Sequence, residues 1–283
     1  MRAFDFAQPN SVDEAIYLLG SNRTSRILAG GTDLLVEMKF NRAHSPEKVI
    51  SLKKLSGLNF IQGGQGLIIG AMTNISLIET SPLVRDNFPA LAEAAASVGS
   101  LQVRNLGTIG GNIGRAAPSA DLVPSLIAYG AEVIVIGPKG KRKMALESFF
   151  KGPGQTVLEQ EILVEISINK DQQKTSSYIK LGKRKAMEIA VVGVAVALDL
   201  DGDVCRDCRI VLGSVAPTVI RAEGAEKVLR GEKLSEKSIE ATAVEAMRAA
   251  KPITDIRATA EYRREMVGVL VKRAIAQAQQ RGQ

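Results

Sequence analysis

Two glycine doublets constrain the folding of this chain more than any other feature of its sequence. Gly30 and Gly31 follow a short strand predicted over residues 26–29, and Gly110 and Gly111 lie much further along the chain. Glycine permits left-handed backbone and close approach of other groups, so both doublets are predicted to form tight turns with bare N–H groups. Two such turns could hold a diphosphate between them. Each doublet taken alone is more simply explained as a structural turn.

Length and composition indicate an ordinary globular protein. The chain has 283 residues, of which 45% are hydrophobic, and it lacks tryptophan. A chain of this size buries a sizeable core and can divide into two or three subdomains. The residues after Met1 contain no apolar stretch long enough for a signal peptide or a membrane span, so a cytoplasmic protein is expected.

The formal net charge of +7 does not by itself indicate a nucleic-acid-binding protein. The basic residues are scattered, with short clusters only at 139–143 and 180–185, and aromatic residues make up 4% of the chain. No aromatic side chain lies within these clusters, as a base-stacking platform would require. A basic surface of this kind is equally suited to docking on acidic partner proteins.

Cys205 and Cys208 are the only two cysteines. Their spacing fits half of a zinc site or a redox dithiol, but a zinc or iron–sulfur cage needs more ligands. His44, the only histidine, lies far away in the sequence. A structural pair flanking the start of a strand is therefore favoured, and no metal site is expected in this chain.

Local patterns predict an α+β chain organised in three regions. Ser11, followed three residues later by Glu14, has the pattern of a helix N-terminus. Pro89 is expected to break or kink a helix predicted over 82–98. The other predicted helices are 121–127, 222–229, 236–249 and 258–278, and the predicted strands are 26–29, 48–52, 58–61, 67–70, 132–136, 161–168, 190–198 and 209–216.

The absence of several known motifs limits the kinds of reaction that this chain could catalyse. The sequence contains no Walker phosphate loop, no dinucleotide fingerprint in a strand-to-helix context and no nucleophile elbow. A single histidine offers little basis for a nucleophile and base pair. No catalytic residue is therefore predicted, and any chemistry would belong to a bound cofactor.

Four motifs, in order along nearly the whole chain, resemble those of one family. Residues 29–39 and 104–122 resemble the two flavin-binding motifs of the FAD subunits of molybdenum hydroxylases, the group of xanthine dehydrogenases and aerobic carbon monoxide dehydrogenases. Residues 213–218 and 255–264 resemble the hallmarks of the C-terminal domain of this family. The resemblance implies the two-subdomain FAD-binding fold of the vanillyl-alcohol oxidase (PCMH) type, followed by an α+β domain with a small antiparallel sheet and helices.

The resemblance also implies where FAD would bind. The cofactor would lie between subdomains 1–57 and 58–172. The C-terminal domain would consist of residues 173–283. Position by position, the FAD-binding residues would be Ile27, Leu28, Ala29, Gly30, Gly31, Thr32, Asp33, Leu34, Val98, Thr108, Ile109, Gly110, Gly111, Asn112, Asp121, Leu163 and Lys180.

Three of these residues carry specific expectations. Asp121 would accept a hydrogen bond from a ribityl or ribose hydroxyl, because a carboxylate beside the diphosphate would be repelled. Leu163, and by the same resemblance Val98, would pack beside the flavin ring. Lys180 would stabilise negative charge on the reduced ring. The plainer alternatives are an acid at a helix start for Asp121, core positions for Leu163 and Val98, and a solvated strand lysine for Lys180.

The family resemblance further implies an electron-transfer subunit. Its partners would be a molybdopterin-bearing large subunit and a small subunit with [2Fe–2S] clusters, doubled by symmetry. Electrons from those clusters would reach FAD and pass to NAD, oxygen, a quinone or another acceptor. The benzoyl-CoA reductase branch, which carries an extra cysteine-rich insertion, is disfavoured because this chain has two cysteines.

Several alternatives stay open on the sequence alone. One is a stand-alone FAD-dependent oxidoreductase with its own substrate pocket, although the scarcity of His and Tyr counts against it. Another is a scaffold subunit that has lost its cofactor. Xanthine, carbon monoxide, aldehydes and N-heterocycles all remain possible substrates of the complex. Arg115 departs from the usual approach to Pro118 in this family, and the sequence does not indicate its effect.

Overall fold

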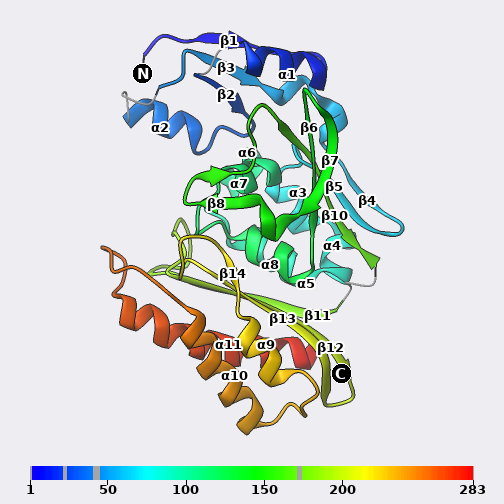
Figure 1. Ribbon diagram of the computed structural model, residues 1–283, viewed down its shortest axis with the longest axis vertical. Helices are drawn as coiled ribbons and strands as arrows, with labels where there is room; N and C mark the ends of the chain where they lie inside the picture. Colours follow the sequence, from blue (N-terminus) through cyan, green and yellow to red (C-terminus); the bar gives the residue numbers. More distant parts are fainter. Residues whose placement is uncertain (1, 22–23, 41–44, 171–173, 283) are drawn as a thin grey trace.

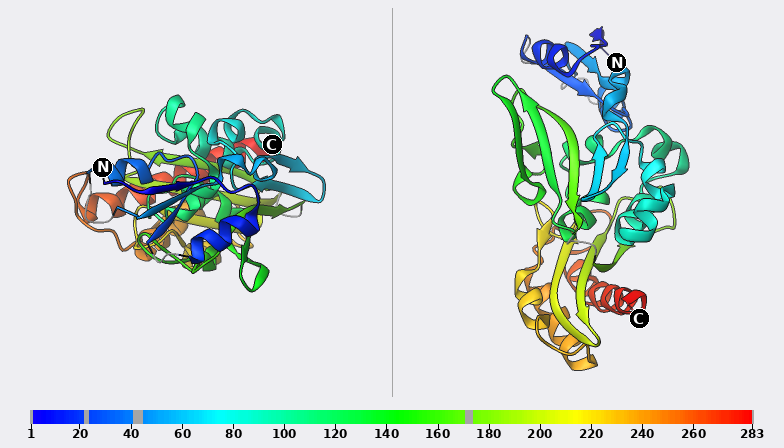
Figure 2. Two further views of the ribbon diagram at one scale, coloured as in Figure 1. Left: turned by 90° about the horizontal axis from the view of Figure 1, so that it is seen from above. Right: turned by 90° about the vertical axis from the view of Figure 1, so that its right-hand side faces the viewer.

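A computed structural model describes residues 2–21, 24–40, 45–170 and 174–282; His44 lies outside this part of the chain. The three larger sheets follow one another along the long axis of the molecule, with the N-terminal unit at one end and the C-terminal helices at the other (Figures 1 and 2). The predicted α+β class is confirmed.

The N-terminal unit is a small parallel sheet with two helices. Ser11 caps its first helix by accepting a hydrogen bond from the N–H of Glu14, which confirms the predicted helix start. The strands pair in the order β1-β3-β2, with both pairs parallel. Its elements are β1 (Asp5–Ala7), α1 (Val12–Gly20), β2 (Ser25–Leu28), α2 (Leu34–Phe40) and β3 (Lys48–Ser51).

The central sheet is antiparallel in the order β4-β5-β10-β6-β7. One face carries Ile69 and Ile166, which pack into the main core, and the other carries Ile134 and Val164, which pack against the N-terminal unit. This second contact joins the two units across a shared apolar layer. The strands are β4 (Ile61–Gly63), β5 (Gly66–Gly70), β6 (Glu132–Gly137), β7 (Gly140–Ala145) and β10 (Ile162–Asn169).

One expectation for this sheet was wrong, and one of its strands was not predicted. The strand predicted over 58–61 begins only at Ile61, because Ser56–Leu58 forms a 3-10 helix that turns Leu58 into the core. The basic cluster 139–143 was not predicted as a strand, yet all of it except Lys139 lies in β7. As an edge strand exposed along most of its length, β7 carries no apolar periodicity that a sequence pattern could detect.

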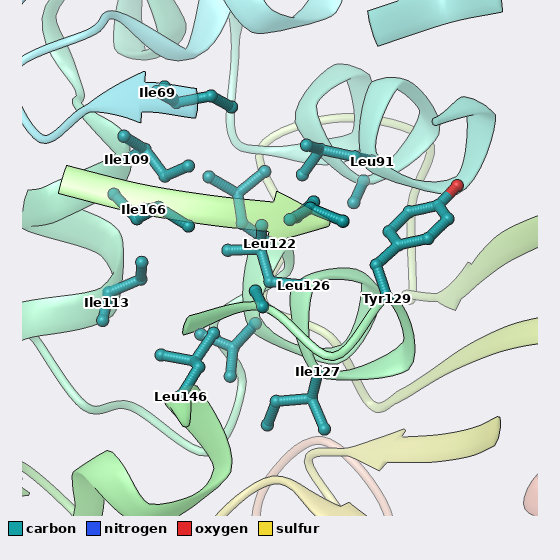
Figure 3. Packing of buried hydrophobic residues seen from close by; sticks show 14 of the residues in the cluster. Ile69, Leu91, Ile109, Ile113, Leu122, Leu126, Ile127, Tyr129, Leu146 and Ile166 are labelled. Carbon is teal, nitrogen blue, oxygen red and sulfur yellow. The ribbon is translucent and has the colours of Figure 1, made fainter. Parts of the chain in front are cut away.

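Short helices cover the main core face of the central sheet. Pro89 starts α5 and ends the preceding helix, so the predicted break is confirmed. Figure 3 shows Ile109, Ile113 and Leu122 gathered around Ile166 of β10. The helices are α3 (Ile75–Thr80), α4 (Pro82–Asn87), α5 (Pro89–Ser97), α6 (Leu101–Leu106), α7 (Ile109–Gly114) and α8 (Leu122–Ala128), with 3-10 turns at Leu52–Lys54 and Leu146–Phe149 and a small hairpin of β8 (Phe150–Gly152) and β9 (Gln155–Thr156).

The C-terminal sheet lies between two helical layers. Along β12, Val194 and Val196 face one core while Ala195 and Ala197 face the other, which explains the unbroken apolar run of this strand. Helices α5 and α8 cover one face, and α9 to α11 cover the opposite face (Figure 1). The elements are β11 (Thr175–Leu181), β12 (Val192–Asp201), β13 (Val204–Gly213), β14 (Ile220–Arg221), α9 (Glu223–Leu229), α10 (Glu236–Ala249) and α11 (Ala260–Gly282).

Both cysteines lie inside β13 and are fully buried, so the prediction that they flank the start of a strand was wrong. Neither forms a disulfide. Between them, Asp207 accepts hydrogen bonds from Lys174 at 2.7 Å and Arg230 at 2.9 Å. Burial alone would raise the pKa of Asp207, but these two cations lower it to about 2.

No helix in the described part of the chain is long and apolar enough to cross a membrane. Within the same residues, no group of His, Cys, Asp and Glu side chains could hold a metal ion. The division into units at 57 and 172 stays a prediction.

Candidate functional site

The two glycine doublets meet at one cavity of about 400 Å3 between the N-terminal unit and the central unit. It is bounded by the loop between β2 and α2, by α6 and α7, and by the start of β10. The predicted residues that line it are Ile27, Ala29, Gly30, Gly31, Thr32, Asp33, Leu34, Val98, Thr108, Gly110, Gly111, Asn112 and Leu163.

The two segments touch through their backbones. A Cβ atom placed on Gly30 would lie 2.1 Å from the carbonyl oxygen of Leu106 and 2.8 Å from the Cα of Gly107. A Cβ atom on Gly111 would lie 3.6 Å from the Cβ of Ala29. Glycine at position 30 is therefore required by a close approach of two main chains. This contact brings the two motifs together.

The first segment presents bare amides, as predicted. Gly31 has a φ of +77°, a left-handed conformation that favours glycine. Among the hydrogen bonds of the described residues, none has the N–H of Gly30, Gly31, Thr32 or Asp33 as its donor. Successive unpaired N–H groups in such a turn form a concave anion-binding surface.

The second segment differs from the prediction. It forms the start of α7 rather than a turn, and none of its glycines has a positive φ. Gly110 donates to the carbonyl of Ala71 at 2.9 Å, and Gly111 donates to the Thr108 hydroxyl at 3.1 Å. Asn112 donates to the Thr108 carbonyl. The expected bare amides are therefore absent from 110–112, and the segment offers side chains instead.

Asn112 provides the clearest sign of an unfilled interaction. Its side chain lines the cavity, and its Oδ1 atom is buried without a hydrogen-bond partner in the described structure. Buried polar groups are paired in the great majority of cases, so this one indicates a missing donor. A ligand hydroxyl would satisfy it. Together with the bare amides of the first segment, this group fits a ligand that carries both phosphates and hydroxyls.

Four predicted residues do not line the cavity. Leu28 supports it from behind, since its Cδ1 would lie 3.1 Å from a Cβ atom on Gly31. Ile109 is fully buried in the core (Figure 3). Asp121 and Lys180 form an ion pair outside the lining, with 2.8 Å between Oδ2 and Nζ.

The Asp121–Lys180 pair is buried and fully engaged. Asp121 also accepts a hydrogen bond from the Tyr178 hydroxyl at 2.9 Å, and the two paired side chains are 8% and 10% exposed. Burial raises the pKa of Asp121, and Lys180 and Tyr178 offset part of this rise. The alternative of a solvated strand lysine is therefore wrong. Asp121 does lie at the start of α8, where an acid was also expected on local grounds.

Lys180 connects this pair to the wall of the cavity. Its Nζ donates a second hydrogen bond to the carbonyl of Ser97 at 3.0 Å, and the next residue, Val98, lines the cavity. Leu163 lines the same cavity from β10, where it is 6% exposed beside a bulge. The paired Lys180 ammonium group is thus bonded to the backbone directly before Val98, one of the apolar residues that line the cavity.

Charged residues at the cavity were mostly not predicted. Arg26, Glu37, Glu161 and Arg115 all contribute to its lining. The sequence singled out only Arg115, as a departure from a family pattern. Glu37 lies within the first motif but was not predicted to bind the cofactor. Arg26 and Glu161 lie outside the motifs, and their approach to the cavity depends on how the three units pack.

The fold is that of an FAD-binding flavoprotein subunit, and the chain belongs to the family of FAD-binding subunits of molybdopterin dehydrogenases. Residues 2–170 match the family model described as the FAD binding domain in molybdopterin dehydrogenase. Residues 177–278 match the CO dehydrogenase flavoprotein C-terminal domain. The class of enzyme is thus that of the molybdenum-containing oxidoreductases, as predicted.

Individual relatives agree with this assignment. The chain is 38% identical over 276 residues to the carbon monoxide dehydrogenase medium chain of Hydrogenophaga pseudoflava, with 96% of each chain covered. It is 36% identical over 251 residues to the nicotinate dehydrogenase FAD-subunit of Eubacterium barkeri, covering 86% of this chain and 84% of that one.

A solved structure supports the same fold. Carbon monoxide dehydrogenase from Hydrogenophaga pseudoflava, in a form that lacks the Mo-pyranopterin moiety of its molybdenum cofactor, contains a chain that superposes with a TM-score of 0.94. The two chains are 37% identical, and the superposition covers 98% of this chain and 97% of the other.

Proposed function

We propose that this chain binds FAD in the cavity between residues 1–57 and 58–172 and serves as the electron-transfer subunit of a molybdopterin-dependent hydroxylase or dehydrogenase. The observation that carries the proposal is the run of unpaired N–H groups from Gly30 to Asp33, held against the second motif by the close contact at Gly30. These donors are suited to the diphosphate of a dinucleotide.

Other residues in and behind the cavity would contact or stabilise the remaining parts of the cofactor. Thr108 and Asn112 offer side-chain oxygen and amide groups for hydroxyls and phosphate oxygens. Val98 and Leu163 provide an apolar wall suited to a flavin ring. Behind this wall, Lys180 holds a positive charge, which favours negative charge on a group bound in front of it. Asp121 keeps Lys180 in place and compensates its charge in the absence of ligand.

Bound FAD would supply the redox chemistry, exchanging electrons with a donor and an acceptor. The donor is proposed to be a small partner subunit with [2Fe–2S] clusters, in a complex with a large molybdopterin-bearing subunit, doubled by symmetry. The relatives named as medium chains and FAD-subunits support a multi-subunit setting. The basic character of the chain, with a net charge of +7, suits acidic partner surfaces. The final acceptor would be NAD, oxygen, a quinone or another external molecule.

Purification of the full chain, alone and with its co-expressed neighbours, tests both parts of this proposal. A flavin absorption spectrum and release of FAD on denaturation are expected for the chain alone. Co-purification with molybdenum and iron in stoichiometric amounts is expected for the complex. A colourless chain that does not bind added FAD would refute the cofactor assignment. A yellow chain that oxidises a substrate with no partner present would instead indicate a stand-alone oxidoreductase.

A further inference from the structure

The cavity carries three carboxylates on its lining, beside Arg26 and Arg115, and carboxylates disfavour the binding of a diphosphate. Asp33, Glu37 and Glu161 all line it. Glu161 is neutralised from outside the lining by Arg142, with which it forms two contacts of 2.6 Å. The other two carboxylates belong to the same loop and helix that present the bare amides. Unopposed, they would repel an anion at the very place where the amides attract it.

Arg115 opposes both of them. Its Nη2 atom donates to Glu37 Oε1 at 2.5 Å, and its Nε lies 3.9 Å from Asp33 Oδ1. The residue follows α7 directly, and its N–H donates to the carbonyl of Gly111. Its guanidinium also borders Gly154 of the β8–β9 hairpin, which lines the cavity too. One side chain thus spans from the second motif to the first.

We propose that Arg115 is a positioning residue for the dinucleotide and acts by charge compensation. It neutralises Glu37 and Asp33, so that the anion-binding loop of 30–33 can receive a diphosphate. Arginine is suited to this task because it stays charged at all relevant pH values and its planar fork reaches two carboxylates at once. This inference rests on the proposed binding of FAD, and it assigns a function to a residue whose effect the sequence did not indicate.

If the Arg115–Glu37 ion pair were only a structural contact, with no effect of its charges on the ligand, a different set of results would be expected. If the Arg115–Glu37 pair merely tied α7 to α2, removal of either partner would weaken binding equally. If Arg115 compensates charge, the two removals have opposite signs. Loss of the arginine leaves two carboxylates facing the ligand, whereas loss of Glu37 leaves an arginine with less to neutralise. The sign of the Glu37 effect therefore separates the two explanations.

The experiment measures binding to the flavin-free full chain by isothermal titration, using three ligands. FAD and ADP carry a diphosphate, whereas riboflavin carries no phosphate. The variants are Arg115→Met, Glu37→Gln and the double variant. Arg206→Met is the matched control, because Arg206 forms an exposed pair with Asp201 at 2.5 Å in the C-terminal sheet, outside the cavity. Circular dichroism verifies that each variant is folded.

Arg115→Met is expected to weaken the binding of FAD and ADP roughly tenfold, which is the scale of one partly screened charge pair near a surface. The affinity for riboflavin should stay unchanged. Glu37→Gln is expected to keep or improve FAD binding, and to recover most of the loss when combined with Arg115→Met. The control should match the wild type. The loss caused by Arg115→Met should shrink at high salt.

Two results would overturn the inference. One is equal weakening by Arg115→Met and Glu37→Gln without recovery in the double variant, and the other is a loss of riboflavin binding as large as that of FAD. If Arg115→Met does not fold, weaker FAD binding by Glu37→Gln alone overturns it. Wild-type chain that binds neither FAD nor ADP would refute the proposed function itself, which is a distinct outcome.

Discussion

Replacement of Gly30 by alanine is the most direct test of how the site is assembled. The added Cβ would lie 2.1 Å from the carbonyl oxygen of Leu106, and contacts under 3.0 Å essentially do not occur. All three neighbouring atoms within 2.8 Å belong to the backbone, so no side chain can rotate away. The two segments must separate by about 1 Å, and overpacking of this kind costs about 1–3 kcal/mol.

The loss is measured by thermal unfolding monitored by circular dichroism. For a chain of this size, we expect the melting temperature to fall by about 2–4 °C per kcal/mol. Gly57→Ala is the control, because a Cβ at this exposed glycine would meet nothing within 4 Å. The control is expected to remain within about 0.5 kcal/mol of the wild type. Flavin content should fall in Gly30→Ala and stay unchanged in Gly57→Ala.

Equal melting temperatures for Gly30→Ala and Gly57→Ala would refute the reasoning. They would mean that the main chains of the two motifs are not held in contact in solution. A stable Gly30→Ala variant that retains FAD fully would show, in addition, that the spacing of the two segments does not limit binding.

Two further predictions concern buried and partly buried charges. Lys180→Met should destabilise the fold by about 3–5 kcal/mol at neutral pH, because it leaves the buried Asp121 carboxylate unpaired. The loss of unfolding free energy, measured with urea, should shrink as the pH falls and Asp121 takes up a proton. Adding Asp121→Asn to Lys180→Met should remove most of this loss. A loss that does not depend on pH would contradict this account. The pKa of Asp207 lies at about 2, below its ordinary value, so its stabilising effect is complete above the ordinary pKa and is lost as the pH falls from about 5 towards 2. Because Asp207 is 40% exposed, Asp207→Asn should cost only about 1 kcal/mol at pH 7 and should flatten the stability profile below pH 5, whereas an unchanged acid limb would exclude the pairing with Lys174 and Arg230.

Local signals in the sequence predicted much of the fold. Ser11 begins a helix, Pro89 divides one, and the alternating run of β10 is a strand, because each of these depends on groups within a few residues. The edge strand β7 was missed because its exposed basic residues carry no periodic pattern. The motifs identified the family, which the comparisons confirm.

The candidate site depends on contacts between distant residues, which local sequence patterns do not predict. The same residue pattern, a glycine doublet, led to two different structures. Gly31 takes the left-handed conformation expected of a turn, whereas Gly110 lies in a helix and is held close to Ala71. Which amide remains bare depends on distant acceptors, here the carbonyl of Ala71, and no pattern around residue 110 encodes that partner.

The sequence by itself determined much of the order of the elements, the family and the residues that form the two motifs, since these follow from the side chains of short segments. Only the tertiary structure decided that the first motif supplies bare amides while the second supplies side chains, that Asp121 pairs with Lys180 behind the wall of the cavity, and that Arg115 faces Glu37. Hydrogen bonds and ion pairs act over a few ångströms in space, and the packing of three units brings together groups that are dozens of residues apart in the chain.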